Sequence, residues 1–175
     1  MTTNAVSDVL SEGFRRLEQL LDEQCAHYRR VDEIVDAQRE SLRGADVESL
    51  VSLSTEEREL LEKIRVIDHR RVELVSAIAS EIGLATKASP ALSDLIEHSG
   101  SRRSRLVTIA DELRQLIAKT RAASRVVRTA AEGLARHMQG IVQSVEQGLS
   151  RSGIYERTGR IVSGPPRHSA IDIRS

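Results

Sequence analysis

The chain has 175 residues, and its 26 basic and 26 acidic side chains give a formal net charge of zero. Only Phe14, Tyr28 and Tyr155 are aromatic, which argues against a globule with a deep core of large rings and favours slender helical packing. The single cysteine, Cys25, excludes an intramolecular disulfide and a cysteine cluster for a metal, so we expect a bland, partly buried thiol.

The first predicted helix covers residues 8–43, with Ser7 or Asp8 suited to cap its start. Apolar side chains recur along it in two rows at seven-residue spacing, which together form the stripe of a coiled-coil seam. Gln24 and Gln38 stand inside one of these rows, where they reduce stability but can fix the register. The two rows are Phe14, Leu21, Tyr28, Val35 and Leu42, and Leu10, Leu17, Gln24, Val31 and Gln38.

A short break follows at Arg43-Gly44-Ala45-Asp46. We expect Gly44 to adopt the left-handed backbone that ends a helix and Asp46 to cap the next one. Because so short a connection joins antiparallel neighbours, the second helix, 46–82, should run back along the first. Ser54-Thr55-Glu56-Glu57 fits a capping box, which predicts a kink or a restart near Ser54.

Gly83 ends the second helix, and Ser89-Pro90 predicts the capped start of a short helix over residues 90–97. The third long helix is predicted over residues 102–149. Its seam consists of one row with Leu106, Leu113, Thr120, Val127, Leu134 and Ile141, and a second with Ala110, Ile117, Ser124, Ala131, Met138 and Val145.

Charge is distributed unevenly among these helices. Residues 1–43 carry 6 basic and 9 acidic groups (−3), residues 44–83 carry 5 and 9 (−4), and residues 101–149 carry 9 and 4 (+5). The two acidic helices and the basic one should therefore complement each other. Arg114, Arg121 and Arg128 flank the third seam at heptad spacing, where we expect them to pair with neighbouring helices, and without interleaved aromatic side chains they do not favour nucleic-acid binding.

The predicted fold is all-α: a long antiparallel three-helix coiled-coil-like bundle with a short connecting helix and a flexible C-terminal tail. Residues 1–149 form the helical domain, and residues 150–175 are a tail rich in glycine and proline. Ile154, Tyr155, Ile161 and Val162 suggest a linear motif in that tail, although a tail without function is the alternative. The N-terminus lacks a signal-peptide pattern and no apolar run could span a bilayer, so we expect a cytoplasmic protein without stable membrane insertion.

The third helix is longer than the first two, and about ten residues should extend beyond an antiparallel bundle. We expect this end to bind a partner's amphipathic helix through a set of apolar side chains. A second copy of the chain covering the same stripe, as a weak homodimer, is the alternative. The candidate binding residues are Leu134, Met138, Ile141, Val142, Val145 and Leu149.

Enzymatic chemistry is not indicated. The five histidines are scattered, no glutamate is followed three residues later by histidine, and phosphate loops and nucleophile elbows are absent from the sequence. We therefore expect neither catalytic residues nor a metal or other cofactor.

The break and the leucine- and glutamate-rich segments after it read Gly44-Ala45-Asp46-Val47-Glu48-Ser49-Leu50 and Thr55-Glu56-Glu57-Arg58-Glu59-Leu60-Leu61. The tail carries a tyrosine shortly before a glycine, in Tyr155-Glu156-Arg157-Thr158-Gly159-Arg160. In these segments, and in its long helices and tail, the chain resembles the FlgN family of flagellar type III export chaperones.

The resemblance implies that the client is the C-terminal segment of a hook-associated protein, a component of the hook–filament junction. It further implies that the tail, through Ile154, Tyr155 and Arg160, contacts the export gate at the membrane. Two alternatives to the chaperone remain open: a homodimeric coiled-coil scaffold or adaptor, and an amphipathic helix lying on a membrane surface.

Overall fold

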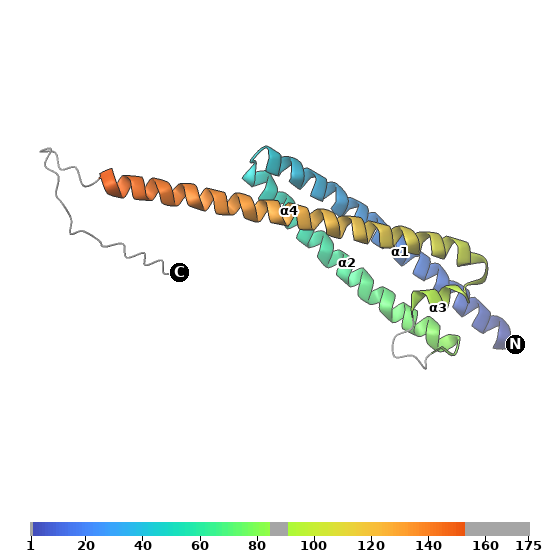
Figure 1. The fold of residues 1–175 in the computed structure, drawn as a ribbon. Helices are drawn as coiled ribbons and strands as arrows, with labels where there is room; N and C mark the ends of the chain where they lie inside the picture. Colours follow the sequence, from blue (N-terminus) through green and yellow to red (C-terminus); the bar gives the residue numbers. More distant parts are fainter. Residues whose placement is uncertain (1, 85–90, 153–175) are drawn as a thin grey trace, which may run out of the picture. The chain divides into compact units, whose positions relative to one another are not determined.

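In the computed structural model the described part of the chain is helical (Figure 1). The backbone is described for residues 2–84 and 91–152, and side chains for residues 9–84 and 91–148. The elements are α1 (Thr2–Arg43), α2 (Val47–Glu81), α3 (Leu92–Ile96), the 3₁₀ helix η1 (Gly100–Arg102) and α4 (Arg103–Ser152). The chain divides into two units, Met1–Ala131 and Glu132–Ser175. The predicted all-α class is confirmed.

The connection between α1 and α2 is a Schellman motif, in which two backbone amides satisfy carbonyls of the last helical turn. The amide of Asp46 donates to the carbonyl of Ser41 at 2.9 Å, and that of Ala45 to Leu42 at 3.2 Å. Ala45, with φ of 53°, holds the left-handed position. The prediction that Gly44 would do so is wrong by one residue, because Gly44 still donates to Glu40 in the helical pattern.

Helix α2 begins as predicted, with the side chain of Asp46 accepting a hydrogen bond from the amide of Ser49 at 3.0 Å. The predicted restart near Ser54 is wrong, since α2 is continuous from Val47 to Glu81. The hydroxyls of Ser54 and Thr55 instead donate to carbonyls one turn earlier, a bond that serine and threonine make inside helices.

Two predicted helix starts also differ from the observed ones. Helix α1 begins at Thr2, ahead of the expected caps at Ser7 and Asp8. Helix α3 begins at Leu92, because Ala91 has an extended backbone that cannot continue a helix from Pro90. Ser89 and Pro90 themselves lie outside the described residues. Gly83, with φ of 75°, ends α2 as expected.

The core of unit Met1–Ala131 consists of two clusters of buried side chains, both contributed by more than two helices. The first lies where α3 packs against α1, α2 and α4, and the second joins α1, α2 and α4 alone. Members of the first are Phe14, Leu17, Leu21, Cys25, Val75, Ile78, Ala79, Leu95, Ile96, Leu106, Ile109, Ala110 and Leu113. Members of the second are Val31, Ile34, Val35, Leu60, Ile64, Ala123 and Val127.

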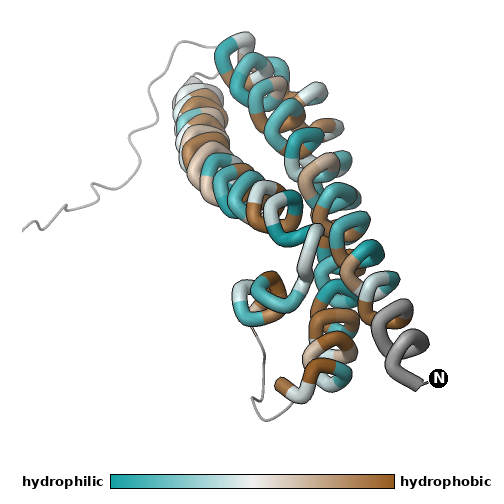
Figure 2. Tube along the Cα trace, turned by 90° about the vertical axis from the view of Figure 1, so that its right-hand side faces the viewer, coloured by the Kyte–Doolittle hydropathy of each residue, from teal (hydrophilic) through white to brown (hydrophobic). Residues whose placement is uncertain are grey.

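The contacts within this unit also give the helix directions. A Cβ at Gly13 would lie 3.1 Å from Ile78, whereas Gln38 bonds Glu57, so α1 and α2 run in opposite directions. Figure 2 shows hydrophobic and hydrophilic residues alternating along these helices, the pattern of elements with one buried face. Coiled-coil packing of the three long helices stays a prediction.

Candidate interaction surface

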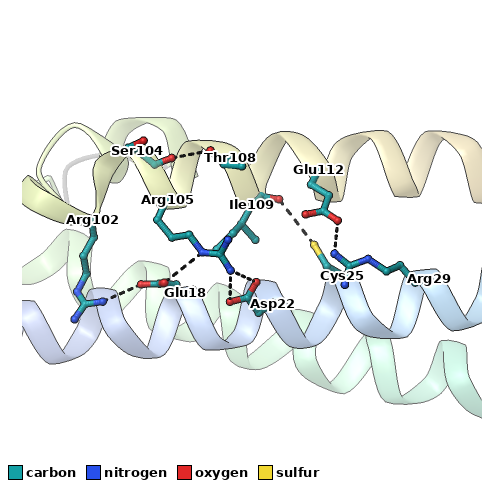
Figure 3. Close-up of polar contacts among 10 residues, drawn as sticks. All are labelled: Glu18, Asp22, Cys25, Arg29, Arg102, Ser104, Arg105, Thr108, Ile109 and Glu112. Carbon is teal, nitrogen blue, oxygen red and sulfur yellow. Dashed lines mark hydrogen bonds and ion pairs between the residues drawn. The ribbon is translucent and has the colours of Figure 1, made fainter.

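A ladder of ion pairs joins α1 to η1 and to the start of α4 (Figure 3). Arg102 pairs with Glu18 at 2.8 Å, and Arg105 with Asp22 at 2.9 Å. The complementarity expected between the acidic helices and the basic one is therefore present for α1. Its basic members differ from those expected, because Arg114 pairs with Asp111 of its own helix.

The ladder continues along both helices with Arg29 against Glu112, and Lys119 against Asp32 at 2.5 Å. Residue numbers rise together in α1 and α4, so these two helices run in the same direction. The hydrogen bond and charge of Asp32 raise the pKa of Lys119. Most of these side chains are about half exposed, and Asp32 and Glu18 are the more buried ones at 16% and 21%. Because exposed ion pairs contribute little free energy, we expect the ladder to fix register more than it adds stability.

Polar side chains also stand inside the core, as the heptad rows predicted. Gln38 is 1% exposed and donates to Glu57 at 2.9 Å, and Glu57 also accepts from Ser124 of α4 at 3.2 Å. Gln24 is 3% exposed and donates to Asp68 at 3.4 Å, a long bond. Within the described residues, the amide oxygens of both glutamines are buried without a hydrogen-bond partner.

Cys25 is more buried than expected. Its side chain is 1% exposed, and its Sγ donates to the carbonyl of Ile109 at 3.9 Å (Figure 3). Burial raises the pKa of this thiol, which keeps it protonated. Cys25 is thus a core side chain between α1 and α4.

The second unit, Glu132–Ser175, carries the candidate binding residues. Met138, Ile141, Val142 and Val145 are 47%, 51%, 55% and 55% exposed. Their spacing of three and four residues puts them on one side of the helix. Leu134 is half-buried, while the side chain of Leu149 and the tail residues Ile154, Tyr155 and Arg160 lie outside the described residues.

A shallow concavity lies beside these side chains and was not anticipated from the sequence. Gly140 is one of its lining residues, and an added Cβ there would meet no atom within 4 Å. The sequence contained an indication of it, because a glycine inside a helix lowers the stability of the helix and often marks a place where a side chain is absent for a structural purpose. The lining residues are Arg136, His137, Gly140, Ile141, Ser144 and Val145.

Exposed aliphatic side chains elsewhere occur singly or, as with Val47 and Val51 at the start of α2, in a pair. On α2 they include Val51, Leu61 and Val72, and on the first part of α4 Val126. Single apolar residues at a surface are normal in soluble proteins. The group from Met138 to Val145 differs, because four such side chains fall within eight residues.

The described residues show neither a metal site nor a membrane span. They contain no group of three or more histidine, cysteine, aspartate or glutamate side chains that could hold a metal ion. None of the helices there is long and apolar enough to cross a membrane.

Comparison with known families decides the assignment. The model of the FlgN protein family matches residues 13–163, which is most of the chain. The chain belongs to the FlgN family. Its general role is therefore that of a flagellar export chaperone. No curated protein and no solved structure matches this FlgN-family chain.

Proposed function

We propose that this FlgN-family chain binds the C-terminal helical segment of a hook-associated protein and delivers it, in the cytoplasm, to the type III export gate. The observation that carries the proposal is the half-exposed apolar group Met138, Ile141, Val142 and Val145. An export chaperone needs an uncovered apolar surface for its client, and helix-in-groove binding uses anchors at this spacing.

The proposed client-binding set adds Leu134 and Leu149 to these four. Burying such a side chain fully stabilises a complex by about 1.5–3 kcal/mol. The loss of translational and rotational freedom on association, and the ordering of side chains at the interface, offset several kcal/mol or more of this binding free energy. The balance suits a reversible complex, which a chaperone that must release its client requires.

The export-gate contact is proposed for the tail, through Ile154, Tyr155 and Arg160. The support is the family match, which continues to residue 163 and so includes these three residues. A Tyr155→Ala variant should keep client affinity and lose binding to the gate's cytoplasmic domain. Client binding lost together with gate binding would contradict a separate role for the tail.

The fold that we propose for the helical domain, predicted over residues 1–149, is the three-helix coiled-coil-like bundle. Because α4 continues to Ser152, the proposed tail begins after that residue and not at residue 150. The three-helix core clusters and opposed directions of α1 and α2 support it. The alternative function is a scaffold in which a second copy of the chain covers the same apolar group, giving a tight homodimer.

Calorimetric titration with C-terminal segments of the same organism's hook-associated proteins, with sedimentation alongside, separates these functions. The chaperone predicts a one-to-one complex that Ile141→Asp weakens by at least about tenfold. Val126→Asp is the matched control, since Val126, like Ile141, is an exposed β-branched aliphatic residue of α4. This control variant should change the affinity less than about twofold. A stable dimer that gives no heat with any segment would favour the scaffold.

A further inference from the structure

The composition of α4 changes between the two units. Residues 103–131 carry nine charged side chains, and this segment uses Arg105, Glu112 and Lys119 for ion pairs with α1. From His137 to Gly148 only Glu146 is formally charged. Charged residues make up 30% of the whole chain, so twelve exposed residues with one charge are unusual.

The exposed apolar group lies within this charge-poor segment. Met138, Ile141, Val142 and Val145 are each about half exposed. Gln139, Gln143 and Gln147 occupy another side of the helix at four-residue spacing. A partner helix that packs on the apolar group between His137 and Gly148 would therefore contact almost only uncharged residues.

Charges at an interface pair only when both partners supply them. A lysine or glutamate of the partner, buried against Met138 to Val145, would lose its hydration without gaining a counter-ion. Arg136, at one end of the concavity beside Gly140, and Glu146 are the charged side chains placed nearest the apolar group. Recognition here must rest on apolar contact and shape.

We propose that the client segment binds through a helix face without charged side chains, so that the affinity does not depend on salt. This inference rests on the proposed function, and it defines the chemistry of the client. The contact face should consist of aliphatic or aromatic side chains bordered by small or amide residues. It contrasts with the way the same helix is held to α1, where ion pairs set the register.

The test is titration of the full chain with the hook-associated C-terminal segment at about 0.1 M and about 1 M NaCl, where the screening length falls from about 10 Å to about 3 Å. The Kd should change by less than about threefold. The variants Arg136→Gln and Glu146→Gln should also bind within about threefold of the parent, with Ile141→Asp as the variant that loses binding.

The outcomes separate the two proposals. Binding that weakens about tenfold or more in high salt, or in Arg136→Gln or Glu146→Gln with helix content unchanged, overturns the uncharged interface and leaves the chaperone function standing. Absence of binding at both salt concentrations overturns the proposed function, and this inference with it.

Discussion

Arg29 of α1 pairs with Glu112 of α4 in the opposite sense to the other ion pairs that the structure describes between these helices. On either side the acid belongs to α1 and the base to α4, as in Asp22–Arg105 and Asp32–Lys119. Sliding α4 by seven residues in either direction would bring Arg105 or Lys119 opposite Arg29. Like charges then meet, so the reversed pair selects one register.

This relationship predicts the effect of charge reversal. Arg29→Glu should lower the Tm by about 1–4 °C, because it places two glutamates together at an exposed site. The double variant Arg29→Glu with Glu112→Arg should recover most of the loss in thermal unfolding followed by circular dichroism. A double variant no more stable than the sum of its single changes would show that the pair has no coupling.

Replacing the two buried glutamines by leucine, one at a time, should change the free energy of unfolding by different amounts. Gln24→Leu should stabilise the fold by about 1 kcal/mol, since it removes an unpartnered amide oxygen and only a 3.4 Å hydrogen bond. Gln38→Leu removes a 2.9 Å bond to Glu57 as well, and should gain less or lose stability. Urea unfolding of both variants measures the difference, and a larger gain for Gln38→Leu would refute this order.

The left-handed residue between α1 and α2 gives a third prediction. Ala45→Gly should stabilise by about 0.5–1 kcal/mol, because a Cβ is strained at φ of 53°. The comparison variant is Gly83→Ala, which introduces the same strain at φ of 75° and should destabilise by a similar amount. Thermal unfolding in which Ala45→Gly loses stability would contradict the Schellman geometry.

Helix α3 has five residues, yet two of them, Leu95 and Ile96, belong to the core. Leu95 is 0% exposed, so Leu95→Ala should cost about 2–5 kcal/mol of unfolding free energy. Leu92→Ala, at a partly buried position of the same helix, should cost distinctly less. Equal effects in chemical unfolding would mean that α3 does not close the core.

Protonation of Glu12 should contribute to the loss of folding stability at acid pH. Hydrogen bonds from Arg15 and Arg16 lower the pKa of its carboxyl to about 2. A lowered folded-state pKa stabilises the fold above the unfolded value of about 4.3, and the contribution disappears as pH falls through about 2. Carboxyl NMR titration should find this low pKa and a rise toward the ordinary value in Arg15→Gln. A parent value near 4 would exclude these pairs in solution.

Heptad spacing in the sequence was enough to predict the helices and much of the core, because the apolar stripe of an amphipathic helix must face the other helices and not water. It placed Leu17, Leu106 and the inward glutamines correctly. Sequence reasoning was wrong at Gly44, because the general preference for glycine in the left-handed conformation pointed to Gly44, whereas Ala45 adopts it. It was also wrong at Ser54, because a serine hydroxyl can bond to a carbonyl inside a helix as well as cap a helix start. The family match extends over the tail motif around Tyr155, whose role stays a proposal.

The burial of Cys25 has a practical consequence. The chain has one cysteine, and its sulfur is covered by α4 through the contact with Ile109. A thiol reagent can therefore react only when α1 and α4 separate around this point. The labelling rate of the unmodified protein reports how often that happens. Comparing this rate with and without client would reveal whether client binding tightens the core around Cys25, without any engineered probe.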